Sequence, residues 1–270
     1  MLRDITLGQY YQSDSVIHKL DPRVKLFAVM MFVITLFTGN HYIHLAVAAI
    51  LLLVLIFISG IPFSYIVRGL RFIAVLLIMS ALCIVFFTRG RELWSYGILH
   101  ITYEGIQKAI FISIRLVLLI LGSSLLTLTT TPGNLTDGMD KSLGFLEKIK
   151  IPVHDIAMMM SIALRFIPIL MEETDKIMKA QTSRGADFES GGMIRRARAL
   201  LPLLVPLFIA AFRRANDLAT AMDARCYMGG TGRTKMRPLH YERRDYIAYL
   251  LIVLYVILMI GIRIIMAIIG

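Results

Sequence analysis

The sequence has little that points to catalysis. It contains two cysteines among 270 residues, Cys83 in an apolar run and Cys226 in a basic region, so we expect no disulfide and a reducing cytoplasmic face. It has no Walker A phosphate loop, no HExxH helix and no nucleophile elbow, so we expect the chain itself to be no enzyme and no ATPase. His41 and His44 are spaced like ligands on a helix, but no carboxylate or cysteine joins them, so no metal site is predicted.

We also expect no cleavable signal peptide, because the segment before the first apolar run contains Asp4, Asp14 and Asp21 and no apolar core. We therefore expect the first membrane span to act as its own insertion signal.

Long apolar runs are what the sequence has in excess. Hydrophobic residues make up 57% of the chain, above the roughly 45–50% of a soluble domain, and they fall in blocks. A membrane-spanning helix needs about 20 mostly apolar residues. The sequence therefore predicts an all-α polytopic membrane protein with about five transmembrane helices. The expected spans are Val24 to Thr38, Ile43 to Ser59, Phe72 to Thr88, Ile106 to Thr131 and Tyr246 to Ile269.

The net charge of +11 fits membrane topology better than nucleic-acid binding, because no basic stretch carries an aromatic stacking platform. Lysine and arginine gather on the cytoplasmic side of membrane proteins. The segment 132–245 holds 18 of the 29 basic residues. This predicts a cell-membrane protein with a cytoplasmic N-terminus and an external C-terminus. Arg115, inside the fourth span, is either a functional charge or a side chain that reaches the outer interface.

The segment between the last two spans is too long for a loop without structure. It predicts a short amphipathic helix over Leu135–Lys148, then two long helices that end at about Arg184 and Tyr227, where glycines follow. Pro168, Pro202 and Pro206 are expected to kink the long helices. We expect these helices to lie at or partly in the membrane, with their polar ends projecting into the cytoplasm; alternatively, Ala199 to Phe212 belongs to an additional pair of spans. The predicted domains are 1–133 (N-terminal tail and four spans), 134–245 (the long-helix module) and 246–270 (the last span).

The two long helices end alike. Each ends on an arginine between two small residues, in Ser183-Arg184-Gly185 and in Ala224-Arg225-Cys226. One interpretation is a helix cap, because a cation at a helix C-terminus stabilises it by about 0.3–1 kcal/mol. The other is an anchor, in which an arginine at a projecting tip binds carboxylates of a partner protein.

Charged pairs precede both tips at the same distance. Glu172 and Glu173 lie 12 and 11 residues before Arg184, and Arg213 and Arg214 lie 12 and 11 residues before the second tip arginine. If the two helices cross at that level, these opposite charges can pair.

Several motifs together resemble the transmembrane T component of energy-coupling factor transporters. They are Leu20-Asp21-Pro22-Arg23-Val24-Lys25-Leu26, Thr129-Thr130-Thr131-Pro132, Leu164-Arg165-Phe166-Ile167-Pro168 followed by Glu172-Glu173, and the two arginine tips, and the resemblance covers nearly the whole chain. It implies import of vitamins or transition-metal ions across a bacterial or archaeal cell (inner) membrane. It also implies that each tip docks into one of two ATP-binding cassette ATPase subunits, and that the long helices, as coupling helices, carry ATPase closure to a separate substrate-binding membrane protein.

The same resemblance implies no cofactor in this chain, with ATP and magnesium bound by the partner ATPases. The family often has Ala-Arg-Gly at both tips, and Ser183 and Cys226 depart from that pattern. Two alternatives stay open on the residues alone. A stand-alone secondary transporter predicts charges or broken helices at the midplane in both halves, and an intramembrane enzyme predicts paired histidines or carboxylates within the spans. Apart from Arg115, the spans offer few such residues.

Overall fold

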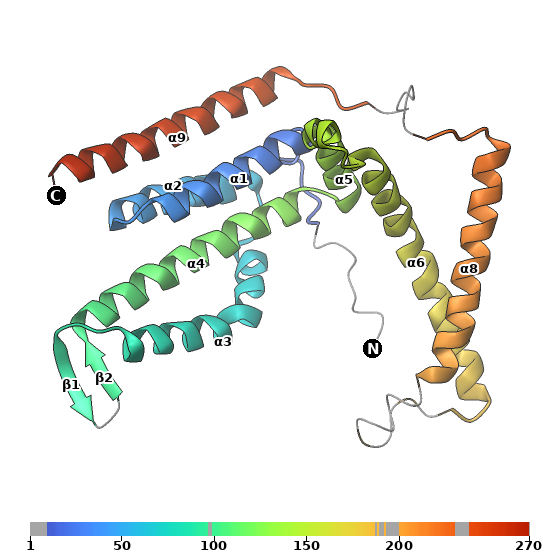
Figure 1. Cartoon of the computed structure of the whole chain (residues 1–270), viewed down its shortest axis with the longest axis horizontal. Helices are drawn as coiled ribbons and strands as arrows, with labels where there is room; N and C mark the ends of the chain where they lie inside the picture. Colours follow the sequence, from blue (N-terminus) through green and yellow to red (C-terminus); the bar gives the residue numbers. More distant parts are fainter. Residues whose placement is uncertain are drawn as a thin grey trace. The chain divides into compact units, whose positions relative to one another are not determined.

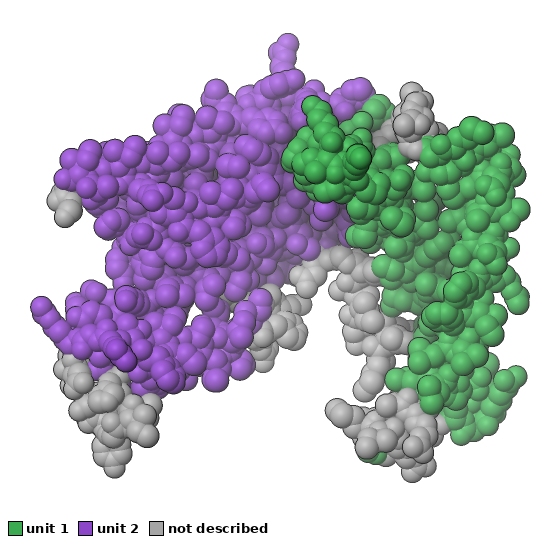
Figure 2. Space-filling view, in the orientation of Figure 1, with its two compact units in different colours: residues 1–7, 140–238 green, residues 8–139, 239–270 purple. Residues whose placement is uncertain are grey.

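The structure is a computed structural model, and it describes residues 10–96, 99–186, 188, 192, 200–229 and 238–269. Contacts between residues divide the chain into two units (Figure 2). Unit 1 consists of Met1–Leu7 and Asp140–Pro238, and unit 2 of Gly8–Met139 and Leu239–Gly270. The chain thus leaves unit 2 once, after α4, and returns to it once, before the last helix.

Unit 2 is built mainly from long apolar helices (Figure 1). They are α1 (Pro22–Thr38), α2 (Tyr42–Ser59), α3 (Phe63–Phe87), α4 (Tyr103–Thr129) and α9 (Arg243–Ile269). The core lies where α1, α2, α4 and α9 meet and contains Leu36, Ala48, Leu52, Leu121 and Tyr255. Many other large apolar side chains of these helices are exposed, as expected for helices surrounded by lipid. The chain is an all-α polytopic membrane protein.

Local signals in the sequence explain where the helices begin and end. Asp21 is the N-cap of α1, its carboxylate accepts the Arg23 backbone N–H, and Pro22 occupies the first turn, where proline costs no hydrogen bond. The Thr102 hydroxyl accepts the Gly105 N–H at the start of α4. Gly60 ends α2 with a φ of 67°, a left-handed conformation that glycine adopts without steric cost.

The connection between α3 and α4 is not a plain loop. It forms an antiparallel hairpin of β1 (Glu92–Tyr96) and β2 (Leu99–Thr102), with Tyr96 opposite Leu99. In the described part of the chain, this hairpin is the exception to an all-helical fold. Strands this short have no periodicity long enough to be read from a sequence.

Among the residues that the structure describes, four helices are long and apolar enough to cross a membrane: α2, α4, α9 and α6 (Val153–Ser183). Three of them match predicted spans. The first predicted span forms a helix of 17 residues, and the part of α3 whose side chains the structure describes contains the shorter apolar helix Ile73–Phe87. Helix α6 was expected to lie at or partly in the membrane, and its apolar first half gives it the composition of a span.

Arg115 has a structural partner within unit 2. Its guanidinium donates a hydrogen bond to the carbonyl of Gly39, which is the C-cap of α1, and its Cζ lies 4.7 Å from the centre of the Phe111 ring. A cation at a helix C-terminus complements the partial negative charge of the last carbonyls. The charge in the fourth span therefore serves as a cap of a neighbouring helix.

Unit 1 contains two long antiparallel helices, α6 and α8 (Leu201–Ala224), which pack against each other (Figure 1). Before them, α5 (Pro132–Ser142) runs from unit 2 into unit 1, and a short 3-10 helix, η2, follows at Gly144–Ile149. The prediction of one continuous helix over 135–148 was wrong, because the chain breaks at Leu143 and η2 ends on Lys150 at a φ of 64°. His154 Nδ1 in the first turn of α6 lies 3.3 Å from Asp140 Oδ1 of α5.

The start of the second long helix was expected at Gly192 or Met193. Helix α8 starts at Leu201, and residues 193–199, where the start was expected, lie outside the described part of the chain. The expectation that Pro202 kinks this helix was wrong, because Pro202 falls in the first turn of α8, where no hydrogen bond is lost. Pro168 and Pro206 lie inside α6 and α8 as expected.

Candidate functional site

The two predicted tips have the same backbone geometry. At the end of α6, Gly185 N–H bonds the Thr182 carbonyl at 2.9 Å and Ala186 N–H bonds the Gln181 carbonyl at 3.0 Å. At the end of α8 the equivalent bonds are Cys226 to Asp223, at 2.9 Å, and Tyr227 to Met222, at 3.1 Å. Both are Schellman motifs, in which the last helical carbonyls bond backbone amides beyond the helix. The arginine is the C-cap residue in both.

The residue after each arginine is in the left-handed region. Gly185 has a φ of 89° and Cys226 a φ of 53°. A side chain costs roughly 1–2 kcal/mol in this conformation and glycine costs none. The first tip therefore has the residue that its geometry favours, and the second tip forms the same turn with a cysteine.

All six predicted tip residues are exposed: Ser183, Arg184, Gly185, Ala224, Arg225 and Cys226. Neither arginine takes part in an ion pair with any residue that the structure describes. A C-cap arginine complements the helix dipole, and its five donors stay available to a partner. Capping and docking, the two interpretations of the sequence, are therefore compatible in one geometry.

The charged pairs before the tips lie where α6 and α8 pack together. The Arg214 guanidinium is 3.6 Å from the Glu173 carboxylate, and the two side chains are 38% and 28% exposed. Glu172 and Arg213 are exposed, and the described residues provide no ion pair for either. Because Glu173 and Arg214 each lie 11 residues before their tip arginine, the two helices meet at the same distance from their C-terminal ends.

This antiparallel arrangement places the two tips at opposite ends of the helix pair. Each tip lies 11 residues beyond the Glu173–Arg214 contact, and the rise per residue of an α-helix is about 1.5 Å, so the tip arginines are on the order of 30 Å apart. This spacing allows the two tip arginines to bind two separate subunits at the same time.

The end of α8 lies against the first half of α6 and forms a groove of about 660 Å³ between them. The Tyr227 hydroxyl donates to the Met158 sulfur at 3.1 Å. The groove is lined by apolar and sulfur-containing side chains together with Arg165 and Arg225. A methionine-rich contact tolerates small displacements, because methionine is unbranched and adapts its shape.

Both helices of unit 1 also expose large apolar side chains. On α8 they include Leu204, Val205, Phe208, Ile209 and Phe212, and on α6 they include Ile156, Met159 and Met160. Exposed apolar patches of this kind mark contacts with lipid or with another protein.

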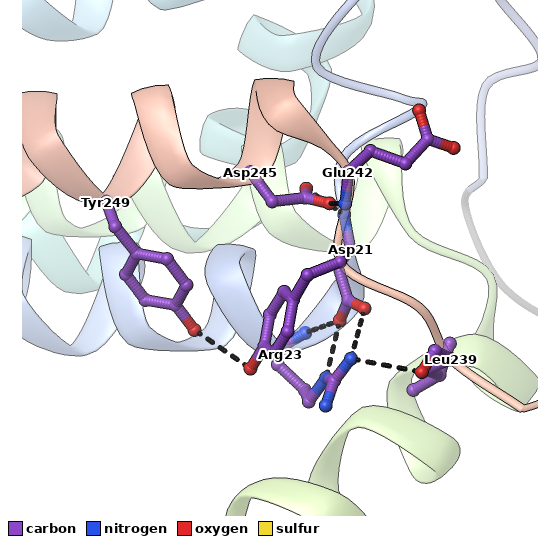
Figure 3. Close-up of polar contacts among 7 residues, drawn as sticks. Asp21, Arg23, Leu239, Glu242, Asp245 and Tyr249 are labelled. Atoms are coloured by element: carbon purple, nitrogen blue, oxygen red, sulfur yellow. Dashed lines mark hydrogen bonds and ion pairs between the residues drawn. The ribbon is translucent and has the colours of Figure 1, made fainter.

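A second polar cluster lies at the start of α1 in unit 2 (Figure 3). The Arg23 guanidinium donates to both carboxylate oxygens of Asp21, at 3.0 and 2.8 Å, and this hydrogen bond with Asp21 raises the pKa of Arg23. The Asp245 carboxylate at the start of α9 accepts the backbone N–H of Asp21 at 2.9 Å and that of Glu242 at 2.8 Å. The first turns of α1 and α9 are thus linked side by side.

Lys25 completes this cluster. Its ammonium group donates to the carbonyls of His18, at 3.0 Å, and of Thr129, at 2.9 Å, and the residue is 7% exposed. In the sequence, Asp21, Arg23 and Lys25 belong to a motif of resemblance that assigns them no role, and Asp245 is part of no motif. No spacing signal could have found it, because Asp21 and Asp245 are 224 residues apart in the chain.

The apolar helices define the chain as an integral membrane protein, and comparisons with known proteins give its family. The sequence matches the CbiQ family, described as cobalt transport protein, over residues 13–236. Similar proteins named "Energy-coupling factor transporter transmembrane protein EcfT" occur in several bacteria. The one from Ruminiclostridium cellulolyticum is 51% identical over 245 residues, which cover 91% of this chain and 92% of the relative.

Relatives from Clostridium kluyveri and Thermosediminibacter oceani have the same name. The first is 51% identical over 252 residues, or 93% of each chain, and the second is 49% identical over 249 residues, or 92% of this chain and 94% of the relative. The chain belongs to the family of transmembrane components of energy-coupling factor transporters. It is therefore a membrane-embedded transporter component and part of a complex with other components.

Proposed function

We propose that this chain is the coupling subunit of an ATP-driven importer. Arg184 and Arg225 each dock one ATP-binding cassette ATPase, which binds ATP and magnesium, while this chain holds no cofactor. The proposal is carried by one observation: two exposed arginines cap identical turns at opposite ends of an antiparallel helix pair.

The proposed mechanism is mechanical. Closure of the two ATPases on ATP draws the tips together, and α6 and α8 shift against each other across the Glu173–Arg214 contact. The exposed apolar side chains of both helices then move against a substrate-binding membrane protein and change its orientation in the bilayer. The adaptable contact between Met158 and Tyr227 permits such a shift without loss of packing. The imported substrate belongs to the vitamins or transition-metal ions.

In the proposed topology, the N-terminus and the polar ends of α6 and α8 lie in the cytoplasm and the C-terminus lies outside. This assignment rests on the concentration of basic residues in the segment 132–245. In this topology both tips are on the side where the ATPases bind ATP.

Affinity pull-down of the solubilised chain, co-expressed with its candidate ATPases, tests the proposal. The wild type is compared with Arg184→Ala, Arg225→Ala and the double variant, and Lys176→Ala removes an exposed cation from α6 two turns before the tip as a control. Loss of an interface arginine typically costs about 2 kcal/mol, or roughly thirtyfold in affinity. We expect each single variant to release one ATPase and the double variant to release both. Equal binding by all variants would show that the tips are caps only, and no binding by the wild type would refute the coupling role.

A further inference from the structure

We propose that Asp21, Arg23 and Lys25, with Asp245, form an anchor that holds both chain connections between unit 2 and unit 1. This inference rests on the proposed coupling function, because an anchor matters where movement of α6 and α8 must reach the membrane helices. A loose connection would absorb that movement. The four residues are therefore positioning residues for coupling.

The outgoing connection, which runs from the end of α4 through α5, is held by Lys25. Its ammonium group donates to the carbonyl of Thr129, the last residue of α4, at 2.9 Å. A lysine at this place complements the negative end of the helix dipole. The chain then continues into α5, where Gly138 packs so closely on Pro22 that a Cβ added to the glycine would lie 2.8 Å from the Pro22 Cβ. The start of α1 thus contacts the outgoing connection at two places.

The returning connection, residues 239–245, is held by Arg23 and Asp21. Arg23 Nη2 donates to the carbonyl of Leu239 at 3.4 Å, and its Cζ lies 3.8 Å from the centre of the Tyr241 ring. The Asp245 carboxylate bonds the backbone of Asp21 and of Glu242 (Figure 3). Residues 239–245 form the first segment of unit 2 after the chain leaves unit 1.

A simple helix cap does not explain these contacts. The cap of α1 requires Asp21 and its local hydrogen bonds, whereas the bonds described here join residues 104, 216 and 224 positions apart in the chain. Asp21, Lys25 and Asp245 are 7%, 7% and 2% exposed. Two carboxylates and two cations balance in charge, which offsets the cost of burying them. A buried cluster whose charges balance and which contacts both connections can hold them in place when α6 and α8 move.

Hydrogen exchange on the complex tests the anchor. The chain and its ATPases are placed in lipid nanodiscs, and amide exchange in α5 and at the start of α9 is followed with and without MgATP and vanadate. Lys25→Met removes the ammonium group, and Lys25→Met/Asp245→Asn restores the charge balance of the cluster in case the single variant does not fold. Lys19→Met is the matched control, because Lys19 pairs only at the surface with Asp14, with side chains 52% and 95% exposed.

We expect the wild type and Lys19→Met to show a nucleotide-dependent change of exchange in both segments. Both Lys25 variants should still bind the ATPases, but their nucleotide-dependent change of exchange should be smaller than that of the wild type by about fivefold or more. The exchange rate in α5 without nucleotide should rise about tenfold. A response equal to that of the wild type in the folded Lys25 variants overturns the anchor. If the wild type binds no ATPase, the coupling function fails instead, and exchange in α5 without nucleotide still decides the anchor: faster exchange supports it and unchanged exchange refutes it.

Discussion

At the scale of single residues, the two tips share every backbone hydrogen bond but differ at the left-handed position. Gly185 is suited to its φ of 89°, whereas Cys226 holds a φ of 53° with a side chain attached. The turn at the end of α8 forms because its amides satisfy the last carbonyls of the helix. The conformational cost at Cys226 is offset by those bonds and by the packing of Tyr227 against Met158.

Replacing Cys226 by glycine should stabilise the second tip by about 1 kcal/mol, because glycine removes the steric cost of the left-handed conformation. The reciprocal change Gly185→Cys should destabilise the first tip by a similar amount. Hydrogen exchange of the last turn of each helix measures both effects. An unchanged or faster exchange in Cys226→Gly would contradict this account of the turn.

His18 gives the cluster at the start of α1 a pH dependence. Its Nε2–H donates to the Tyr11 carbonyl at 2.9 Å, and in the neutral ring its Nδ1 accepts from the Ser15 hydroxyl at 2.7 Å. Burial lowers the pKa of His18 below its ordinary value of 6.5; the nearby charge of Lys25 lowers it further, and Asp14 opposes the shift. The folded state therefore binds the proton less readily than the unfolded chain does.

We expect stability from this group to be full above about pH 6.5 and to decline as the pH falls below that value, because the unfolded chain then takes up more protons. Thermal unfolding of the purified protein between about pH 7.5 and pH 5 measures the decline. His18→Gln should show a shallower decline over the same range. An identical profile in the variant would exclude His18 as the source.

At the scale of secondary-structure elements, the contact between α6 and α8 depends on one ion pair and on apolar packing. Arg214 and Glu173 are 3.6 Å apart and partly exposed, so solvent screens their attraction. The pair contributes to the register of the two helices more than to their stability. A register shift of one turn would separate these two charges and would also break the contact between Tyr227 and Met158.

Charge reversal tests this register. Glu173→Arg and Arg214→Glu should each destabilise the helix pair, and the double reversal should recover a coupling energy of about 0.2–1 kcal/mol. Thermal unfolding of the four proteins provides the double-mutant cycle. The same cycle at Glu172 and Arg213, which are exposed, is the control and should give no coupling; equal coupling in both cycles would contradict the described contact.

At the scale of the whole molecule, the arrangement of α6 and α8 decides how far apart the tips can lie. An antiparallel pair that meets 11 residues before each tip separates the arginines by about 30 Å, whereas a parallel pair would bring them together. Spin labels at positions 183 and 224, after Cys83→Ser and Cys226→Ser, measure this distance by electron–electron double resonance. A distance distribution centred below about 15 Å would contradict the antiparallel pair.

Much of the helical fold could be predicted because apolar runs and caps are local signals. The ends of α2 and α6 at Gly60 and Gly185 agree with the glycines that mark them. The break at Leu143 and the hairpin between α3 and α4 were missed, because a short element has too few residues for a period to stand out. Of the candidate site, the sequence predicted which residues lie at the tips; whether those tips dock on ATPases stays a prediction.

The sequence by itself determined the membrane class, the two arginine tips and the charges that precede them, since each depends on residues close together in the chain. The tertiary structure decided that α6 and α8 are antiparallel, that Arg115 caps α1, and that Asp21, Lys25 and Asp245 share one buried cluster. These contacts join residues from 41 positions apart, for Glu173 and Arg214, to 224 positions apart, for Asp21 and Asp245. Hydrogen bonds and ion pairs act over a few ångströms in space, so such partners are fixed only when the helices have packed.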